Sequence, residues 1–166
     1  MSWAPHVTVA TVVYRQQEGD RDGKYLLVYE ESEGQMVYNQ PAGHLEADET
    51  LEQAALRETL EETGWHINLT GVLGITLYTS PRNGVTYHRT TFVAEPLTEV
   101  PNPTLDEGIE AAIWLSYEEI LERRDQLRSE VVLEVIEDHR RDTCYPLEMI
   151  RTRGDSEAVP TVALPA

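Results

Sequence analysis

The chain has 166 residues, of which 40% are hydrophobic, so it is long enough to bury one core and fits a single globular domain. Its 30 acidic and 13 basic residues give a net charge of −17, which makes nonspecific binding to DNA or RNA unfavourable. A single cysteine excludes an intramolecular disulfide, and no run reaches the roughly 20 apolar residues of a membrane span. We therefore expect a cytoplasmic protein with no nucleic-acid or membrane partner.

The N-terminal part of the chain favours strands. Residues 6–14 are rich in β-branched side chains, which predicts a buried strand rather than a signal peptide. Residues 24–29 predict a second strand after a polar turn, and residues 36–39 are short and extended. Pro41 keeps the chain extended just before the segment that follows.

A helix is predicted between residues 50 and 64. Thr50 and Gln53 have the spacing of a capping box, with Asp48 as an alternative N-cap, and Gly64 suits the left-handed position that ends a helix. One side of this helix is expected to pack on a sheet. The residues expected on that side are Leu56, Leu60 and Thr63, with Thr59 between the two faces and able to bond back to the preceding turn.

The other side of the predicted helix is acidic. At about 100° per residue, Glu58, Glu61 and Glu62 lie one above another on a single face. Three like charges on one stripe repel each other, and a divalent cation resolves the conflict because hard cations such as Mg²⁺ take carboxylate oxygens as ligands. The segment therefore predicts a metal site, although a solvated acidic face is the usual reading of such a run taken alone.

The C-terminal half mixes strands and helices. Residues 67–79 and 87–94 predict a hairpin, for which Asn83 and Gly84 are a strong turn signal, and the three prolines within 95–108 predict a loop. Residues 111–115 predict a short strand, and Ser116 the start of a short helix to about residue 122. A longer helix is predicted from Arg128 or Ser129 to about residue 140.

The spacing of the polar residues around the predicted helix follows the pattern G-x5-E-x7-R-E-U-x-E-E-x-G-U. Its fixed positions are Gly43, Glu49, Arg57, Glu58, Glu61, Glu62 and Gly64. This pattern resembles the Nudix box of hydrolases that act on nucleoside diphosphates linked to another group. The usually aliphatic U positions hold Thr59 and Trp65 here.

The resemblance extends from about residue 5 to residue 150. The segments PHVTVATVV, YNQPAGHLEADETLEQAA, YHRTTF, LRSEVV and YPLEMI are similar to the NudJ-type phosphatase group of Nudix hydrolases. The resemblance implies an α/β (α+β) fold, a Nudix-type α/β/α sandwich with a mixed central sheet. We accordingly expect a domain at 1–150 and a flexible tail at 151–166.

What the resemblance implies about activity is hydrolysis of nucleoside tri- and diphosphates with Mg²⁺, or Mn²⁺, with stepwise release of orthophosphate. The group is also associated with the diphosphate of 4-amino-2-methyl-5-hydroxymethylpyrimidine. The partner expected is thus a small nucleotide or a pyrimidine diphosphate, and the protein is expected to be a monomer or a homodimer.

The metal ligands predicted on this basis are Glu58, Glu61, Glu62 and the carbonyl of Gly43. The base that takes a proton from water is Glu58 or Glu61 by similarity, with Arg57 holding the neighbouring carboxylates. A carboxylate from the 106–110 loop is an alternative, and its candidates are Glu107 and Glu110.

The substrate-binding residues are predicted from charge and aromatic character. Arg89 in a strand, and Arg128 with Ser129 at a helix start, are suited to hold phosphate. Tyr38 and Tyr78 are suited to stack on a base, as is Trp114, for which core packing is the simpler interpretation.

Two other interpretations remain open. Pro81 lies 16 residues beyond Trp65, which resembles the downstream proline of ADP-ribose and ADP-sugar pyrophosphatases. A nucleotide sensor that keeps the fold without turnover is a second alternative, but it has no need for the complete set of Arg57 and the three glutamates. A plain interaction domain with an acidic surface is a third, which the intact box disfavours.

Overall fold

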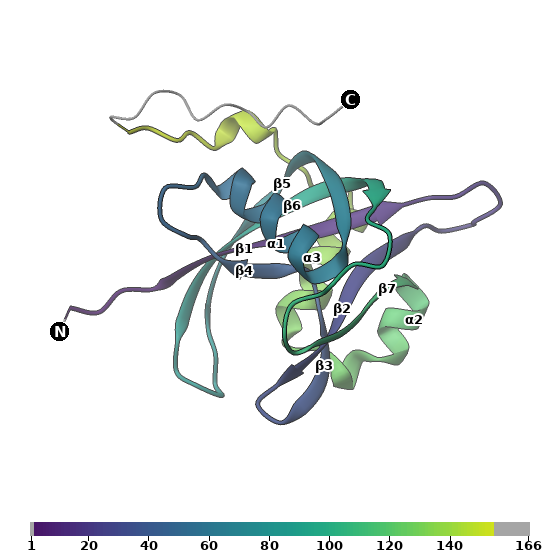
Figure 1. Cartoon of the computed structure of the whole chain (residues 1–166), viewed down its shortest axis with the longest axis horizontal. Coiled ribbons are helices and arrows are strands. Elements are labelled where there is room, and N and C mark those ends of the chain that lie inside the picture. Colours follow the sequence, from purple (N-terminus) through teal and green to yellow (C-terminus); the bar gives the residue numbers. More distant parts are fainter. Residues whose placement is uncertain (1, 155–166) are drawn as a thin grey trace.

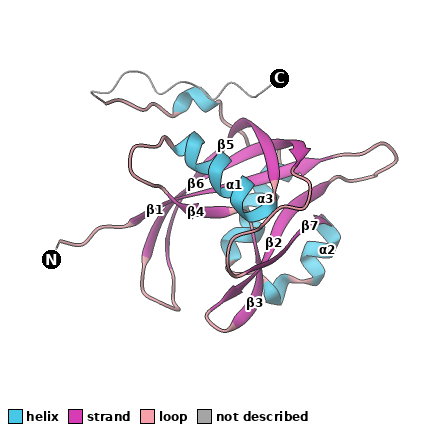
Figure 2. Ribbon diagram, viewed as in Figure 1, coloured by secondary structure: helices cyan, strands magenta, loops and turns pink. Residues whose placement is uncertain are grey.

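The computed structural model describes residues 2–154, which form a seven-stranded sheet and three α-helices. The strands are β1 (His6–Arg15), β2 (Lys24–Ser32), β3 (Gln35–Asn39), β4 (Ala42–His44), β5 (Trp65–Thr79), β6 (Thr86–Glu99) and β7 (Ile109–Ser116). The helices are α1 (Leu51–Thr63), α2 (Tyr117–Glu122) and α3 (Glu130–Arg140), with single 3₁₀ turns η1 (Arg124–Gln126) and η2 (Leu147–Met149). Figure 2 shows the strands and helices in different colours, with four strands before α1 and three between α1 and α2.

The sheet is mixed, and β1 is its organising strand. The strands β3, β2, β1, β6 and β5 lie in that order, while β4 pairs with β1 and β7 pairs with β2. β1 runs parallel to β6 and antiparallel to β2 and β4. β5 and β6 form a long hairpin that extends beyond the rest of the sheet (Figure 1).

Alternating residues of the central strands pack on opposite faces of the sheet. On β1, Val12 contributes to the cluster that holds the buried residues of α3, whereas Val9 packs with Ala54 and Ala55 of α1. Since neighbouring positions on a strand point to opposite sides, α1 and α3 must cover different faces. Figure 1 agrees, with α1 in front of the sheet and α3 behind it. The expected α/β/α arrangement around a mixed sheet is confirmed.

The ends of α1 are those that the sequence predicts. The Thr50 side chain accepts from the Gln53 N–H at 3.1 Å, and the Gln53 side chain accepts from the Thr50 N–H at 2.9 Å. Asp48, the alternative N-cap, precedes the helix with a positive φ of 63°. Gly64 ends the helix at φ 74°, in the left-handed region that glycine tolerates best.

The packed side of α1 differs from the prediction in part, although Thr63 is buried as expected. Ala54, Ala55 and Thr59 are buried, and Leu60 stays partly exposed outside the hydrophobic clusters, although Leu56 does pack on one. The small side chains let α1 lie close to β1, where the hydroxyls of Thr59 and Thr11 are 2.8 Å apart. The Thr59 hydroxyl also bonds the Ala55 carbonyl at 2.8 Å, as expected.

The strands β6 and β4 also differ from the prediction. Residues 95–99 continue β6 as partner of the first residues of β5, so the predicted loop begins only at residue 100. Pro96 is tolerated there because it lies opposite Ile67, at an irregularity in the register. β4 was not predicted, since its three residues carry no strand signal of their own and form a strand by pairing with β1.

None of the helices within residues 2–154 is long and apolar enough to cross a membrane. The predicted flexible tail at 151–166 lies outside the described residues from residue 155 onward. The domain boundary at residue 150 stays a prediction.

Candidate active site

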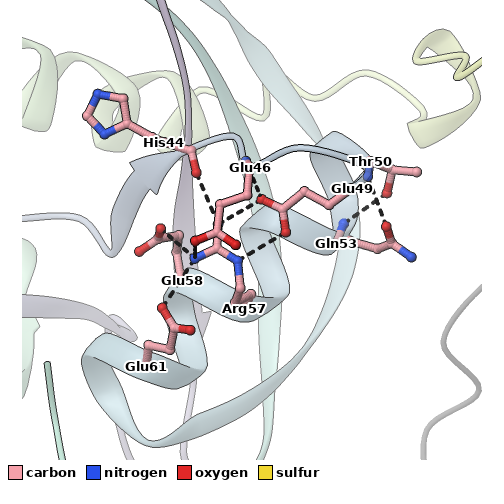
Figure 3. Close-up of polar contacts among 8 residues, drawn as sticks. All are labelled: His44, Glu46, Glu49, Thr50, Gln53, Arg57, Glu58 and Glu61. Atoms are coloured by element: carbon pink, nitrogen blue, oxygen red, sulfur yellow. Dashed lines mark hydrogen bonds and ion pairs between the residues drawn. The ribbon is translucent and has the colours of Figure 1, made fainter.

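Arg57 is the centre of a network of carboxylates on the exposed side of α1 (Figure 3). Its guanidinium donates to both carboxylate oxygens of Glu49, at 3.0 Å from Nε and 2.7 Å from Nη2. Nη1 donates to Glu58 at 2.8 Å and to Glu61 at 3.2 Å, and Nη2 also reaches the carbonyl of His44 at 3.0 Å. These hydrogen bonds lower the pKa of the Glu49 carboxyl and raise the pKa of Arg57. The arginine therefore fixes the carboxylates in place.

Three carboxylates converge next to this network. Among residues 2–154, oxygens of Glu58, Glu61 and Asp106 lie within 4.8 Å of one another. Asp106 comes from the loop between β6 and β7, which is held against the C-terminal end of α1 because its N–H donates to the Glu61 carbonyl at 3.1 Å. Burial raises the pKa of Glu58, and its contacts with Arg57 oppose that rise.

Gly43 lies on β4, directly against these acids. A Cβ added at Gly43 would overlap the Glu58 carboxyl group, so only a residue without a side chain allows this approach of backbone to carboxylate. Gly43 is paired with Val9 of β1, and this pairing holds β4 in its position relative to α1. The presence of glycine at this position of the box is thus explained sterically by the structure.

Glu62 is placed differently from the other two glutamates of the predicted set. Its side chain is buried, and its carboxylate accepts the Ala42 N–H at 2.7 Å. Burial is the main cause that raises the pKa of Glu62 to about 9, and the nearby charges of Glu30, Glu58 and Asp106 act in the same direction. Glu62 is outside the group of three converging carboxylates, and its role as a ligand stays a prediction.

The residues present fit a divalent cation. Hard cations take carboxylate and carbonyl oxygens as ligands. The converging acids offer carboxylate oxygens, and Gly43 lies directly against one of these acids, Glu58. Without a cation, the like charges of Glu58, Glu61 and Asp106 repel across less than 5 Å. Burial of Glu58 and Glu62 adds a desolvation penalty, which a bound cation would remove.

A pocket of about 190 Å³ lies beside β4, and all three residues of that strand line it. Its lining includes Gly43 and three arginines, Arg82, Arg89 and Arg128, against the single acid Glu33. It also contains the aromatic rings of Tyr78 and Tyr87, the hydroxyl-bearing Ser80 and Ser129, and the side chains of Asn39 and His44. A cationic pocket in a chain of net charge −17 is a local inversion of the field that suits an anionic ligand.

The two predicted phosphate-binding arginines have different partners. Arg128 donates to the buried carboxylate of Glu30 at 2.8 Å, and the Asn39 side-chain amide donates to the same oxygen at 3.2 Å. Arg89 donates from Nη2 to the side-chain oxygen of Gln40 at 2.9 Å, while its buried Nε has no partner among the described residues. Partial burial lowers the pKa of Arg89 to about 10.

The start of α3 forms one wall of the pocket. Ser129 is the N-cap residue, but its side chain makes no capping hydrogen bond and lines the pocket instead. Val131, in the first turn, also lines the pocket. The Arg128 N–H is held by the Tyr38 carbonyl at 2.9 Å, which ties the approach to α3 to the end of β3.

The aromatic residues predicted to stack on a base have different surroundings in the structure. Tyr78 lines the pocket, whereas Tyr38 does not and packs on Tyr29, with ring centroids 4.7 Å apart. Trp114 packs edge-on against Trp65, and the Arg15 guanidinium lies 4.0 Å from its ring centroid. This arrangement is the core packing expected as the simpler interpretation of Trp114.

Sequence reasoning missed Asp106, although it identified the 106–110 loop. Glu107 and Glu110, the named candidates, are outside the group of converging carboxylates. The available signal was that Asp106 begins an acidic stretch after three prolines, but its position depends on how the loop packs on Gly64 and Glu61. Asn39 and Gln40, which support the pocket, were also missed.

The chain is similar to known proteins over most of its length. A family model described as NUDIX domain matches residues 4–135. Phosphatase NudJ of Escherichia coli strain K12 is 41% identical over 146 residues, which cover 88% of this chain and 90% of that relative. The solved NUDIX hydrolase from Nitrosomonas europaea has a TM-score of 0.84 and 40% identity, and the match covers 92% of this chain and all of the other (100%).

A more distant solved structure shares the fold. It is the NUDIX domain of Shewanella oneidensis NrtR, complexed with ADP ribose, with a TM-score of 0.64 and 20% identity. The match covers 85% of this chain and 90% of that one.

Proposed function

The chain belongs to the Nudix family of hydrolases, which act on phosphoanhydrides, and from this premise we propose that it is a Mg²⁺-dependent phosphatase of nucleoside tri- and diphosphates. It releases orthophosphate, and its substrates include the diphosphate of 4-amino-2-methyl-5-hydroxymethylpyrimidine. The observation that carries the proposal is the position of Gly43. This residue touches the converging carboxylates through Glu58 and also lines the arginine-rich pocket.

Glu58, Glu61, Glu62 and the Gly43 carbonyl hold the cation in this proposal, and Asp106 joins them from the loop. Mn²⁺ has the same preference for oxygen ligands and can replace Mg²⁺. A divalent cation held there supplies charge neutralisation on phosphate oxygens and makes water a better nucleophile.

The residues of the chain do the positioning and the proton transfer. Arg57 holds Glu58 and Glu61 at fixed distances, so that both carboxylates face the same point. Glu58, whose pKa is raised by burial, accepts the proton of the attacking water more readily than an ordinary carboxylate does. Water attacks the terminal phosphorus, the phosphoanhydride bond to the bridging oxygen breaks, and the substrate with one phosphate fewer departs with that oxygen, so that the attacked group is released as orthophosphate. Glu61 is the alternative base.

The pocket holds the rest of the substrate. Arg89 and Arg128 donate to phosphate oxygens, and Ser129 adds its hydroxyl at the start of α3. Tyr78 stacks on the base, and Tyr38 supports this region through the backbone that binds Arg128. The partner is thus a small nucleotide or pyrimidine diphosphate. We also propose a cytoplasmic location, with either a monomer or a homodimer as the assembly.

A second candidate is an ADP-ribose or ADP-sugar pyrophosphatase. Pro81 lies between Ser80 and Arg82, which both line the pocket, so the hairpin turn that carries it borders the proposed binding site. The NrtR domain described above was solved with ADP ribose. A nucleotide sensor without turnover is the third candidate.

A substrate panel separates the candidates. Purified protein is incubated with Mg²⁺ and GTP, GDP, ADP-ribose or the pyrimidine diphosphate, and phosphate is measured before and after added pyrophosphatase. Free phosphate from GDP without pyrophosphatase supports the phosphatase. AMP from ADP-ribose alone supports the second candidate, and tight nucleotide binding without turnover supports the sensor.

Two variants test the site itself. Glu61→Gln and Glu62→Gln remove one carboxylate each while keeping side-chain size, so turnover should fall by orders of magnitude and calorimetric Mg²⁺ uptake should weaken. Circular dichroism should show the fold intact. Full activity of both variants would overturn the assignment of these glutamates.

A further inference from the structure

We propose that Gln40 is a positioning residue that holds Arg89 and the first turn of α3 as two walls of one subsite for a terminal phosphate group. The inference rests on the proposed function of the pocket and adds the residue that organises it. Gln40 itself is buried and does not line the pocket. It acts through the groups to which it is bonded.

The amide of Gln40 joins two elements that are far apart in the sequence. Its oxygen accepts from Nη2 of Arg89 on β6 at 2.9 Å, and its nitrogen donates to the carbonyl of Val132 at 2.7 Å. Val132 is in the first turn of α3, three residues beyond Ser129, which lines the pocket. One buried side chain therefore fixes the distance between the arginine and the helix start.

Because the side chain of Gln40 is an amide and not a carboxylate, it does not neutralise the charge of Arg89. Arg57 is surrounded by the carboxylates of Glu49, Glu58 and Glu61, and Arg128 is paired with Glu30. Arg89 forms no ion pair within residues 2–154, and its fixed partner is neutral. Its positive charge thus stays available to a ligand, and its Nε is a donor without a partner in that part of the chain.

The helix start supplies the matching donors. α3 has eleven residues, and the N–H groups of its first turn carry the positive end of the helix dipole. Ser129 makes no side-chain cap within residues 2–154, so the helix start does not occupy its hydroxyl and a ligand oxygen can use it. A guanidinium and a helix N-terminus that line one pocket recognise a group that accepts hydrogen bonds on several oxygens. A terminal phosphate has that chemistry, and so does the orthophosphate product.

The test measures anion binding without turnover. Inorganic phosphate and pyrophosphate are titrated calorimetrically into the wild-type protein in metal-free buffer that contains a chelator. Gln40→Met removes both hydrogen bonds at similar size, and we expect the dissociation constant for pyrophosphate to rise roughly tenfold. Arg89→Gln should produce a similar rise. In the double variant, the two effects should be clearly less than additive, because part of the effect of Gln40→Met passes through Arg89.

Tyr25→Phe is the matched control. The Tyr25 hydroxyl is bonded to Nδ1 of His139 at 2.7 Å, so this partly buried contact ties the sheet to the other end of α3. The variant loses one hydrogen bond to the same helix and should bind pyrophosphate as the wild type does. If Gln40→Met fails to fold, Gln40→Glu replaces it. That change keeps the size but neutralises Arg89, and it should also weaken anion binding.

The kinetic arm uses any substrate found to turn over. Gln40→Met should raise KM and leave kcat close to that of the wild type, because the metal-binding acids are untouched. Equal weakening of anion binding by Tyr25→Phe, additive effects in the double variant, or no anion binding by the wild type would each overturn the inference. Anion binding that depends on Gln40 in a protein without hydrolytic activity would uphold the inference and defeat the proposed function.

Discussion

At the scale of the residue, the site depends on one close approach between backbone and side chain. Gly43 leaves no room for a Cβ beside the Glu58 carboxyl, and Glu58 is in turn bonded to Arg57. A side chain at position 43 would have to push the carboxylate away from its arginine. The spacing of the box predicted Gly43 as a ligand through its carbonyl, and the structure gives it a steric role as well.

Gly43→Ala should therefore displace Glu58 and lower Mg²⁺ affinity roughly 10- to 100-fold, as loss of a supporting contact at a metal site does. Calorimetric titration of Mg²⁺ measures this effect directly. Gly19→Ala is the control, since nothing lies within 4 Å of the added Cβ, while its φ of 92° strains the backbone of the connection between β1 and β2. Unchanged Mg²⁺ affinity in Gly43→Ala would contradict the steric argument.

At the scale of the element, α1 was the segment best predicted from sequence, because its signals are local. Thr50, Gln53 and Gly64 define its ends through contacts within a few residues. The three-residue β4 could not be predicted in this way, because its pairing partner β1 is more than 30 residues away. The same reason applies to the site. Arg57 and the glutamates follow from spacing, but Asp106 and Gln40 reach it through tertiary packing.

Thr50→Ala should lower the free energy of unfolding by about 1 kcal/mol, since it removes the N-cap bond and leaves Gln53 without its reciprocal partner. Urea denaturation followed by circular dichroism measures the change. Thr50→Ser keeps the hydroxyl and should retain most of the stability. If the alanine and serine variants unfold at the same urea concentration, the capping box does not stabilise α1 as described.

At the scale of the whole molecule, stability is linked to pH through buried acids. The pKa of Glu62 is about 9 in the folded protein, against an ordinary value of 4.5. Between these values, the folded chain holds a proton that the unfolded chain has released. The contribution of Glu62 is therefore complete below the lower value and is lost as the pH rises through the higher one. Burial raises the pKa of Glu58 too, which acts in the same direction.

The Glu62 contribution to the stability of the metal-free protein should accordingly fall as the pH rises from about 5 to about 8.5, with a slope of about 1.4 kcal/mol per pH unit. Thermal unfolding in chelator at several pH values measures the slope. Glu62→Gln cannot titrate and should flatten the curve relative to the wild type. Parallel curves for the two proteins would show that Glu62 is already ionised in the folded state.

The parallel pairing of β1 with β6 also determines when the protein can fold during synthesis. The register joins His6 to Tyr87 and Val13 to Ala94, so one flank of the N-terminal strand finds its neighbour about eighty residues later. Such distant pairing slows folding, because a long loop must close before the contact forms. In a nascent chain on the ribosome, the edge of β1 that pairs with β6 therefore stays unpaired until more than half of the polypeptide has emerged.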